Sequence, residues 1–213
     1  MKAQRGEDDV FWEPAETATV EIKIKRSLFV GRLGLCRSAE EVRSILDGAE
    51  SDYRDATHHC WAYRLGPDPQ VEHSSDGGEP AGTAGKPILS AIRQSGMHNV
   101  MVVVTRYFGG IKLGVRGLIE AYGQTAAGVV GKVVRVSRVR SRRVVIRLPY
   151  AVIGDIAHFL EVHGVAGAPS WSYDSQVEVA ADVRWSVVPQ ITMMLDEFQA
   201  RKRIHSWNWV LLK

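Results

Sequence analysis

Alternating polar and apolar positions near the start of the chain predict a strand followed by a helix. Residues 19–25 place Val20, Ile22 and Ile24 on one face and charged side chains on the other, as in a half-buried strand. A helix is expected to begin at Ser38, because Glu41 completes a capping box with it. Further elements are expected as strands at 28–35, 58–65 and 99–107 and as helices at 87–96 and 118–134.

The pattern changes after residue 138 and predicts a second, smaller unit. Its elements follow the order β-α-β-β-α-β, which is the ferredoxin-like arrangement. The expected elements are a strand at 139–148, a helix ended by Gly164, strands near 168–173 and 176–185, a helix through 188–198 and a strand at 204–212. We therefore expect an α+β protein with domains over 17–136 and 139–213, preceded by a poorly ordered tail over 1–16.

Composition supports a soluble globular protein. Hydrophobic residues make up 45% of the 213 residues and charged residues 24%. The apolar runs are too short to cross a bilayer, and the N-terminus lacks a secretory signal, so a cytoplasmic protein without membrane contact is expected. Cys36 and Cys60 lack the spacing of metal ligands and are interpreted as buried free thiols. Neither a metal nor a cofactor is expected.

The first glycine-rich segment, 74–87, is interpreted as an anion-binding loop. Glycines expose backbone N–H groups, and a helix N-terminus follows directly. It is not a nucleotide-binding P-loop, because Pro80 and Pro87 stand where that pattern needs Gly and Ser or Thr. The alternative is a rigid loop in which acidic side chains hold backbone amides. The candidate binding residues here are Ser75, Asp76, Glu79, Thr83 and Lys86.

The second glycine-rich segment, 105–117, combines glycines that expose the backbone, two aromatic residues and three cations. This mixture is typical of phosphate contact with base stacking. The alternative is a strand-to-helix turn whose glycines allow tight packing, with Phe108 in the core. The candidate binding residues are Arg106, Tyr107, Gly109, Gly110, Lys112 and Arg116.

An enzymatic alternative rests on His58, Asp76 and Glu79. Convergence of these three side chains would favour a hydrolase. His58 and Cys60 share one face of a predicted strand, but no second pair of ligands supports a metal site, and adjacent positions on one strand need not bring thiol and imidazole together. A polar face directed toward the loop site is preferred, and a binding protein is favoured over an enzyme.

A basic stretch lies between the two predicted domains, in a window from Ala121 to Gly154 without Asp or Glu. Strand alternation would place Arg138, Arg140 and Arg142 on one side. RNA contact there would neutralise roughly 3–4 phosphates and give a log–log salt slope of about −2 to −3. The alternative is a solvated strand and interdomain connection. The candidate basic surface consists of Lys132, Arg135, Arg138, Arg140, Arg142 and Arg143.

Several ordered motifs within 22–128 resemble the YigZ/IMPACT family. The motifs are KRSLFVG at 25–31, HxCWAY at 58–63, SDGGEPAGTAGKP at 75–87, TRYFGGIKLG at 105–114, and GLI with AYG within 117–123. The resemblance implies a first domain of the ribosomal protein S5 domain 2-like fold. It implies a second domain like a terminal domain of elongation factor G, and the short N-terminal extension fits the bacterial YigZ-type arrangement.

The resemblance also implies a role in translation. The family is associated with translational control, so the expected partners are RNA, the ribosome or a translation factor, with no sequence-specific reading of DNA. A pure protein-interaction module is the further alternative. Three positions depart from the family pattern: Gly77 replaces an Asp, Arg116 a Gly and Glu120 an Arg. The departures weaken a paired-carboxylate mechanism and change the charge of the second loop.

Overall fold

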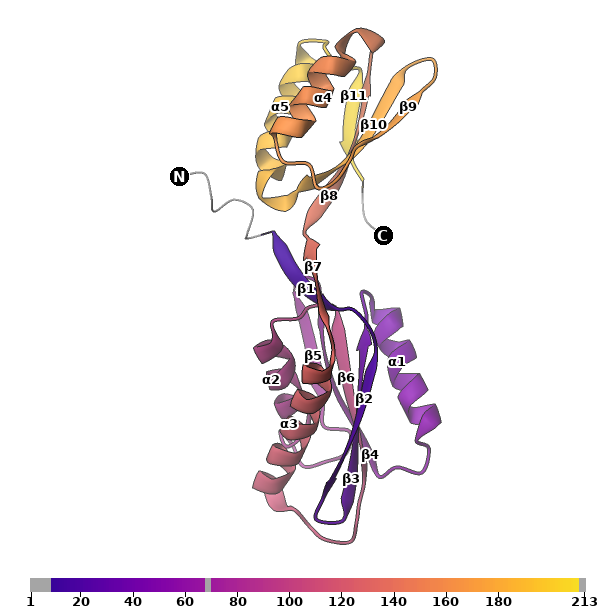
Figure 1. Ribbon diagram of the computed structural model, residues 1–213, viewed down its shortest axis with the longest axis vertical. Helices are drawn as coiled ribbons and strands as arrows, with labels where there is room; N and C mark the ends of the chain where they lie inside the picture. Colours follow the sequence, from indigo (N-terminus) through magenta and orange to yellow (C-terminus); the bar gives the residue numbers. More distant parts are fainter. Residues whose placement is uncertain (1–8, 68–69, 211–213) are drawn as a thin grey trace. The chain divides into compact units, whose positions relative to one another are not determined.

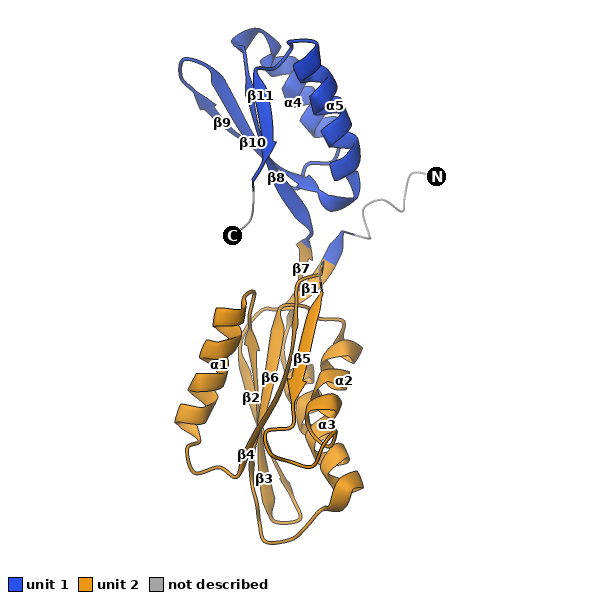
Figure 2. Cartoon of the chain, turned by 180° about the vertical axis from the view of Figure 1, so that it is seen from behind, with its two compact units in different colours: residues 1–10, 139–213 blue, residues 11–138 orange. Residues whose placement is uncertain are grey.

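The computed structural model describes residues 9–67 and 70–210 (Figure 1). It is an α+β structure that divides into two compact units, one of residues 11–138 and one of residues 1–10 with 139–213 (Figure 2). No helix in the described part of the chain is long and apolar enough to span a membrane.

The unit of residues 11–138 is built on a five-stranded antiparallel sheet with the strand order β2-β3-β6-β4-β5. Helices α2 and α3 pack on one face of this sheet and α1 on the other (Figure 1). The strands are β2 (Ala18–Ile24), β3 (Ser27–Leu35), β4 (His58–Leu65), β5 (Val71–Ser75) and β6 (Val100–Tyr107). The helices are α1 (Ala39–Asp52), α2 (Gly85–Ser95) and α3 (Gly114–Lys132).

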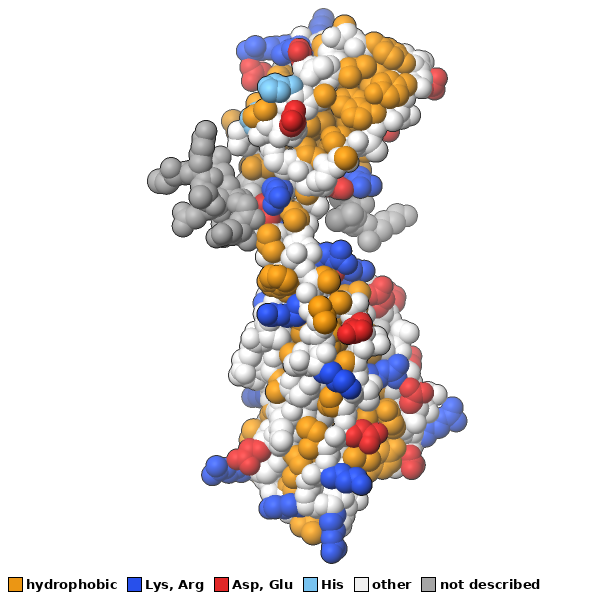
Figure 3. Space-filling model, viewed as in Figure 1, with side chains coloured by type: hydrophobic (Ala, Val, Ile, Leu, Met, Phe, Trp, Pro, Cys, Tyr) orange, Lys and Arg blue, Asp and Glu red, His pale blue; other side chains and the backbone are white. Residues whose placement is uncertain are grey.

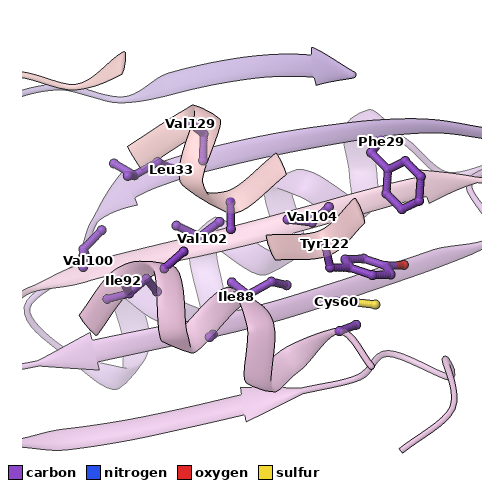
Figure 4. Packing of buried hydrophobic residues seen from close by; sticks show 14 of the residues in the cluster. Phe29, Leu33, Cys60, Ile88, Ile92, Val100, Val102, Val104, Tyr122 and Val129 are labelled. Atoms are coloured by element: carbon purple, nitrogen blue, oxygen red, sulfur yellow. The ribbon is translucent and has the colours of Figure 1, made fainter. Parts of the chain in front are cut away.

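The central strand β6 explains where the core of this unit lies. It is buried from Val100 to Arg106, as expected of a β-branched run covered on both faces. Side chains of α2 and α3 close over Val102 and Val104 on one face (Figure 4). The rings of Phe29 and Tyr122 meet edge to face there, with their centroids 5.2 Å apart.

Local signals in the sequence account for the helix ends. Ser38 is the N-cap of α1, and its hydroxyl accepts a hydrogen bond from the Glu41 amide at 3.3 Å, which is one half of the predicted capping box. The Glu41 carboxylate accepts from the Arg37 amide at 2.7 Å and not from the Ser38 amide. Gly96 ends α2 with a φ of 69°, a left-handed conformation that glycine adopts without a steric penalty. These two predicted boundaries are confirmed.

The second unit holds a four-stranded antiparallel sheet of order β11-β8-β10-β9. Its main elements are β8 (Ser141–Leu148), α4 (Ile153–Val162), β9 (Ser170–Tyr173), β10 (Val177–Arg184), α5 (Val188–Ala200) and β11 (Ser206–Trp209), with short 3-10 turns at Tyr150–Val152 and Trp185–Val187. Alternate residues Val144, Ile146 and Leu148 enter the core, which is shared with both helices.

Three expectations about the chain are wrong. Within the expected tail 1–16, β1 (Val10–Pro14) is a strand that pairs with β7 (Arg135–Val139), while residues 1–8 lie outside the described part. Within the expected loop 66–86, β5 pairs with β4, so part of this polar segment belongs to the sheet. The strand expected at 139–148 begins only at Ser141, as β8, because residue 139 ends the separate strand β7.

Candidate functional site

A buried ion pair joins the two glycine-rich segments. Arg106 lies near the end of β6, and Glu79 lies in the loop between β5 and α2. Nη1 of Arg106 donates to Oε1 of Glu79 at 2.6 Å, and the two side chains are only 6% and 4% exposed. The structure therefore brings segments 74–87 and 105–117 together.

The surroundings of the ion pair are partly aromatic. Tyr122 of α3 donates its hydroxyl to the same Oε1 of Glu79 at 2.9 Å, and Nη2 of Arg106 lies 3.4 Å from the Ser27 hydroxyl. The rings of Phe29 and Phe108 lie 5.5 and 5.4 Å from Cζ of Arg106. Burial is the largest cause that raises the pKa of Tyr122, and the nearby Cys60 and Glu79 raise it further, so the hydroxyl stays protonated.

Asp76 occupies the backbone amides that were expected to bind an anion. Its carboxylate accepts hydrogen bonds from the amides of Gly82, Ala84 and Gly85 at 2.8, 3.0 and 2.8 Å. Burial alone would raise the pKa of Asp76, but the three amide bonds outweigh it and hold the pKa below its usual value. The expectation that these amides bind an external anion is thus wrong, because an internal carboxylate already fills the nest.

Several loop glycines are required by close packing. A Cβ on Gly109 would lie 2.1 Å from the carbonyl carbon and oxygen of Arg26, and a Cβ on Gly77 would lie 2.1 Å from the carbonyl oxygen of His59. A Cβ on Gly85 would approach the Ser75 backbone to 2.9 Å. These contacts agree with the interpretation of tight packing.

A pocket of about 340 Å³ opens beside the ion pair. Its polar lining comes from Glu79, Arg106 and Lys112. The rest of its wall is apolar and comes from Pro80, Phe108, Leu113, Val115 and Leu118. Phe108 is 45% exposed, so the alternative that placed Phe108 in the core is wrong, and Val115 is 62% exposed. Sequence reasoning missed these pocket residues because apolar side chains in a loop and a first helical turn are read as core.

The other predicted binding residues have separate surroundings. The hydroxyl of Ser75 accepts from the Gly77 amide, and the hydroxyl of Thr83 donates to the Pro80 carbonyl. Tyr107 donates its hydroxyl to Asp55, and Arg116 pairs with Glu120 at 2.8 Å. The exposed positions among the predicted set are Lys86, Gly110, Lys112 and Arg116.

The three residues of the hydrolase alternative point to different partners. Nδ1 of His58 lies 2.9 Å from the Gly77 carbonyl oxygen, while Asp76 holds amides and Glu79 holds Arg106 and Tyr122. The Cys60 thiol donates to the Asp76 carbonyl at 2.9 Å. Burial is the main cause that raises the pKa of this thiol to about 12. The arrangement therefore contains neither the predicted convergence nor an activated thiolate.

The predicted basic surface belongs to two units, and its cations are engaged. In the unit of residues 11–138, Arg138 pairs with Glu13 at 3.0 Å, and Lys132 donates to the Thr19 carbonyl. The remaining contacts are Arg135 with the Ser95 carbonyl, Arg140 over Trp185, Arg142 over Trp209 and Arg143 with Asp182. Arg138 lies in β7, Arg142 lies in β8 and Arg140 lies between them, so the single strand from which their alternation was expected is not present.

Cations and apolar side chains occur together on the surface of the unit of residues 11–138. Figure 3 shows Lys and Arg side chains beside hydrophobic ones at the end of the unit that carries the β2–β3 turn and the β6–α3 loop. Lys25, Arg26 and Lys112 are exposed in these two connections. The fold and this combination define a class of protein: a two-unit α+β protein with a small apolar pocket rimmed by cations.

The chain belongs to the IMPACT family. The Impact N-terminal domain matches residues 25–130. The chain is 32% identical over 178 residues to the IMPACT family member YvyE of Bacillus subtilis (strain 168), covering 80% of this chain and 82% of YvyE. It is 43% identical over 112 residues to the IMPACT family member YigZ of Escherichia coli (strain K12), covering 52% of this chain and 55% of YigZ.

A solved crystal structure of a hypothetical protein shows a similar chain fold. It is 28% identical to this chain, with a TM-score of 0.65, and the match covers 96% of this chain and 98% of the other. The resemblance to the YigZ/IMPACT family that the motifs indicated is confirmed by these comparisons.

Proposed function

We propose that this protein is a translation-associated binding protein that contacts its partner through the pocket and the loops around it. One observation carries the proposal: an apolar pocket lies open beside Lys112, while the acids that would serve catalysis are held in internal bonds. Membership of the IMPACT family supports the role in translation, because the family is associated with translational control.

The finer assignment of the two units is part of the proposal. We assign residues 17–136 to the ribosomal protein S5 domain 2-like fold and residues 139–213 to a ferredoxin-like fold resembling a domain of elongation factor G. The strand order β11-β8-β10-β9 supports the second assignment. Fold likeness alone does not define a partner, so the site must be tested directly. A cytoplasmic location is proposed with this role.

The candidate partners are RNA, the ribosome and a ribosome-bound factor. Exposed cations at Lys86, Lys112 and Arg116 support contact with an anionic surface. The engaged arginines of the basic stretch lessen the support for extended RNA binding. Each phosphate that the protein neutralises on single-stranded RNA contributes about −0.7 to the log–log salt slope, so a shallow slope is expected if RNA binds at all.

Co-sedimentation with purified bacterial ribosomes tests the proposal. We expect the protein to sediment with ribosomes, and the double variant Lys112→Glu with Arg116→Glu to lose about fivefold or more of this binding, since two charges at the site are reversed. Lys23→Glu is the matched control, because Lys23 is exposed on β2 of the same unit. Equal loss in the control, or sedimentation unaffected by the double variant, would refute this site.

Two further measurements separate the partners. Filter binding to structured and single-stranded RNA at several salt concentrations measures direct RNA contact. Absence of binding at low salt would exclude RNA as the direct partner. Affinity capture from lysate with and without nuclease then distinguishes a translation factor from RNA. Capture that survives nuclease and fails in the double variant is the result expected for a protein partner.

A further inference from the structure

Arg106, which lines the pocket, carries a buried hydrogen-bond donor that lacks an acceptor. Nε of Arg106 is buried and has no hydrogen-bond partner in the described part of the chain, although Nη1 and Nη2 are directed to Glu79 and Ser27. The residue as a whole is 5% exposed and lines the pocket. Buried N–H groups in folded proteins are nearly always paired, so this one indicates a missing acceptor.

The first turn of α3 adds a second source of positive potential at the same pocket. The helix begins at Gly114, which lines the pocket together with Lys112 and Val115. Its N-cap, Leu113, gives no side-chain hydrogen bond, and the first turn contains no acidic residue. Free amides at a helix start attract negative charge.

Internal pairing limits the charge that the pocket can accept. Glu79 is compensated by Arg106, and the exposed Glu120 by Arg116. Lys112 and the start of α3 remain, which together match a single negative charge rather than a polyanion.

The walls of the pocket determine the rest of the ligand. Pro80, Phe108, Leu113, Val115 and Leu118 offer no side-chain donors or acceptors. A nucleobase read along its polar edges would leave those edges unpaired against these walls. At about 340 Å³, the pocket has room for one aromatic or branched aliphatic group.

We propose that this pocket binds an apolar carboxylate, a ligand in which one aromatic or aliphatic group carries a single carboxylate. The inference rests on the proposed function, because it specifies the chemistry of the same binding site. The carboxylate lies at the start of α3 beside Lys112 and accepts from Nε of Arg106. Water does not reach that Nε, so Phe108, which is 45% exposed with its ring 5.4 Å from Cζ, turns aside on binding.

Two isosteric probes test the charge requirement in the full-length protein. NMR titration with 3-phenylpropionate is expected to shift amide signals of residues 110–118 with a dissociation constant of about 1 mM. The neutral 3-phenylpropanamide has the same ring and is expected to bind about fivefold or more weakly. Absence of shifts up to about 20 mM acid, or equal binding of acid and amide, overturns the proposal.

Variants at the two ends of α3 locate the site. Val115→Asp places a carboxylate in the first helical turn, which is expected to abolish acid binding while maintaining or raising the thermal midpoint, because an acid there favours the helix. Lys112→Gln should weaken acid binding about threefold and leave amide binding unchanged. Lys132→Gln, at the C-terminal end of α3, is the matched control with no expected effect. An effect of the control equal to that of Lys112→Gln contradicts the site.

A third comparison identifies the source of the carboxylate. A tripeptide, acetyl-Ala-Ala-Phe, is titrated with a free C-terminus and as its amide. Tighter binding of the free tripeptide than of 3-phenylpropionate indicates the C-terminal residue of a protein partner. Tighter binding of 3-phenylpropionate indicates a free small acid. Either result supports the inference. If neither acid binds but Val115→Asp abolishes ribosome co-sedimentation, the ligand class is wrong while the proposed function stands.

Discussion

Glu79 is the residue on which both glycine-rich segments and helix α3 converge. Its Oε1 accepts from Arg106 and from Tyr122, at 2.6 and 2.9 Å. Removing two charges from water is unfavourable, so such a pair is stable only when its geometry and hydrogen bonds are good. Removing one partner leaves the other charge buried without compensation.

Glu79→Ala should therefore destabilise the protein by about 3–5 kcal/mol in denaturant unfolding, because Arg106 loses its counter-ion in a buried setting. Glu120→Ala is the matched control, because the Glu120 and Arg116 side chains form an ion pair in which they are 63% and 93% exposed. The control should change the free energy of unfolding by less than about 1 kcal/mol. Similar losses in both variants would show that the buried pair contributes no more to the free energy of unfolding than the exposed pair does.

Asp76→Asn should reveal acid-dependent stability. The folded pKa of Asp76 lies below the usual 3.8, so its contribution is present above that value and is lost as pH falls through the folded pKa. The difference in unfolding free energy between wild type and Asp76→Asn should be full at about pH 6 and should shrink below about pH 4. Denaturant titrations at several pH values measure it, and a difference independent of pH would contradict the assigned amide bonds.

At the level of elements, the packing of glycines determines how the loops meet the sheet. Gly109 lies two residues after the end of β6, against the backbone of Arg26. Gly131 lies in the last turn of α3, where an added Cβ would have no atom within 4 Å. The same substitution should thus have opposite effects at the two positions.

Gly109→Ala should destabilise the protein by about 3 kcal/mol or more, because the new methyl group would collide with backbone rather than with a flexible side chain. Gly131→Ala should stabilise it by about 0.5–1 kcal/mol, since alanine favours the helix and meets open space. Thermal unfolding of both variants measures the contrast. A tolerated Gly109→Ala would mean that the loop can move away from the β2–β3 turn.

The elements with strong local signals could be predicted from the sequence. The Ser38 N-cap of α1, the apolar run of β6 and the glycine end of α2 are all present where expected. Strand β5 was missed, because its sequence VEHSS is polar and only its pairing with β4 makes it a strand. The partners of Asp76 and Glu79 were likewise beyond prediction, because they depend on the three-dimensional course of the loops.

At the scale of the molecule, Glu13 ties together segments that are far apart in the chain. This buried carboxylate on β1 accepts from Arg37 at 2.9 Å, from Asn99 at 2.6 Å and from Arg138 at 3.0 Å. All four residues belong to the unit of residues 11–138. Burial opposes its ionisation, but the three hydrogen bonds outweigh burial and lower the pKa of Glu13.

Glu13→Ala should lower the unfolding free energy by about 2–4 kcal/mol, chiefly because the buried Asn99 amide loses its acceptor. Both arginines are about half exposed and can return to water. Glu16→Ala, at an exposed position just after β1, is the control and should stay within about 0.5 kcal/mol of wild type. An unaffected Glu13→Ala variant would show that β1 adds little to the unit.

The pairing of β1 with β7 has a consequence for biosynthesis. The first strand leaves the ribosomal exit tunnel early, but its partner is translated more than a hundred residues later. At about 5–20 residues per second, the nascent β1 waits roughly 6–25 seconds with unpaired backbone groups. During that interval it is open to association with other chains, so nascent-chain chaperones should matter more for this N-terminal segment than for the local hairpin of β2 and β3.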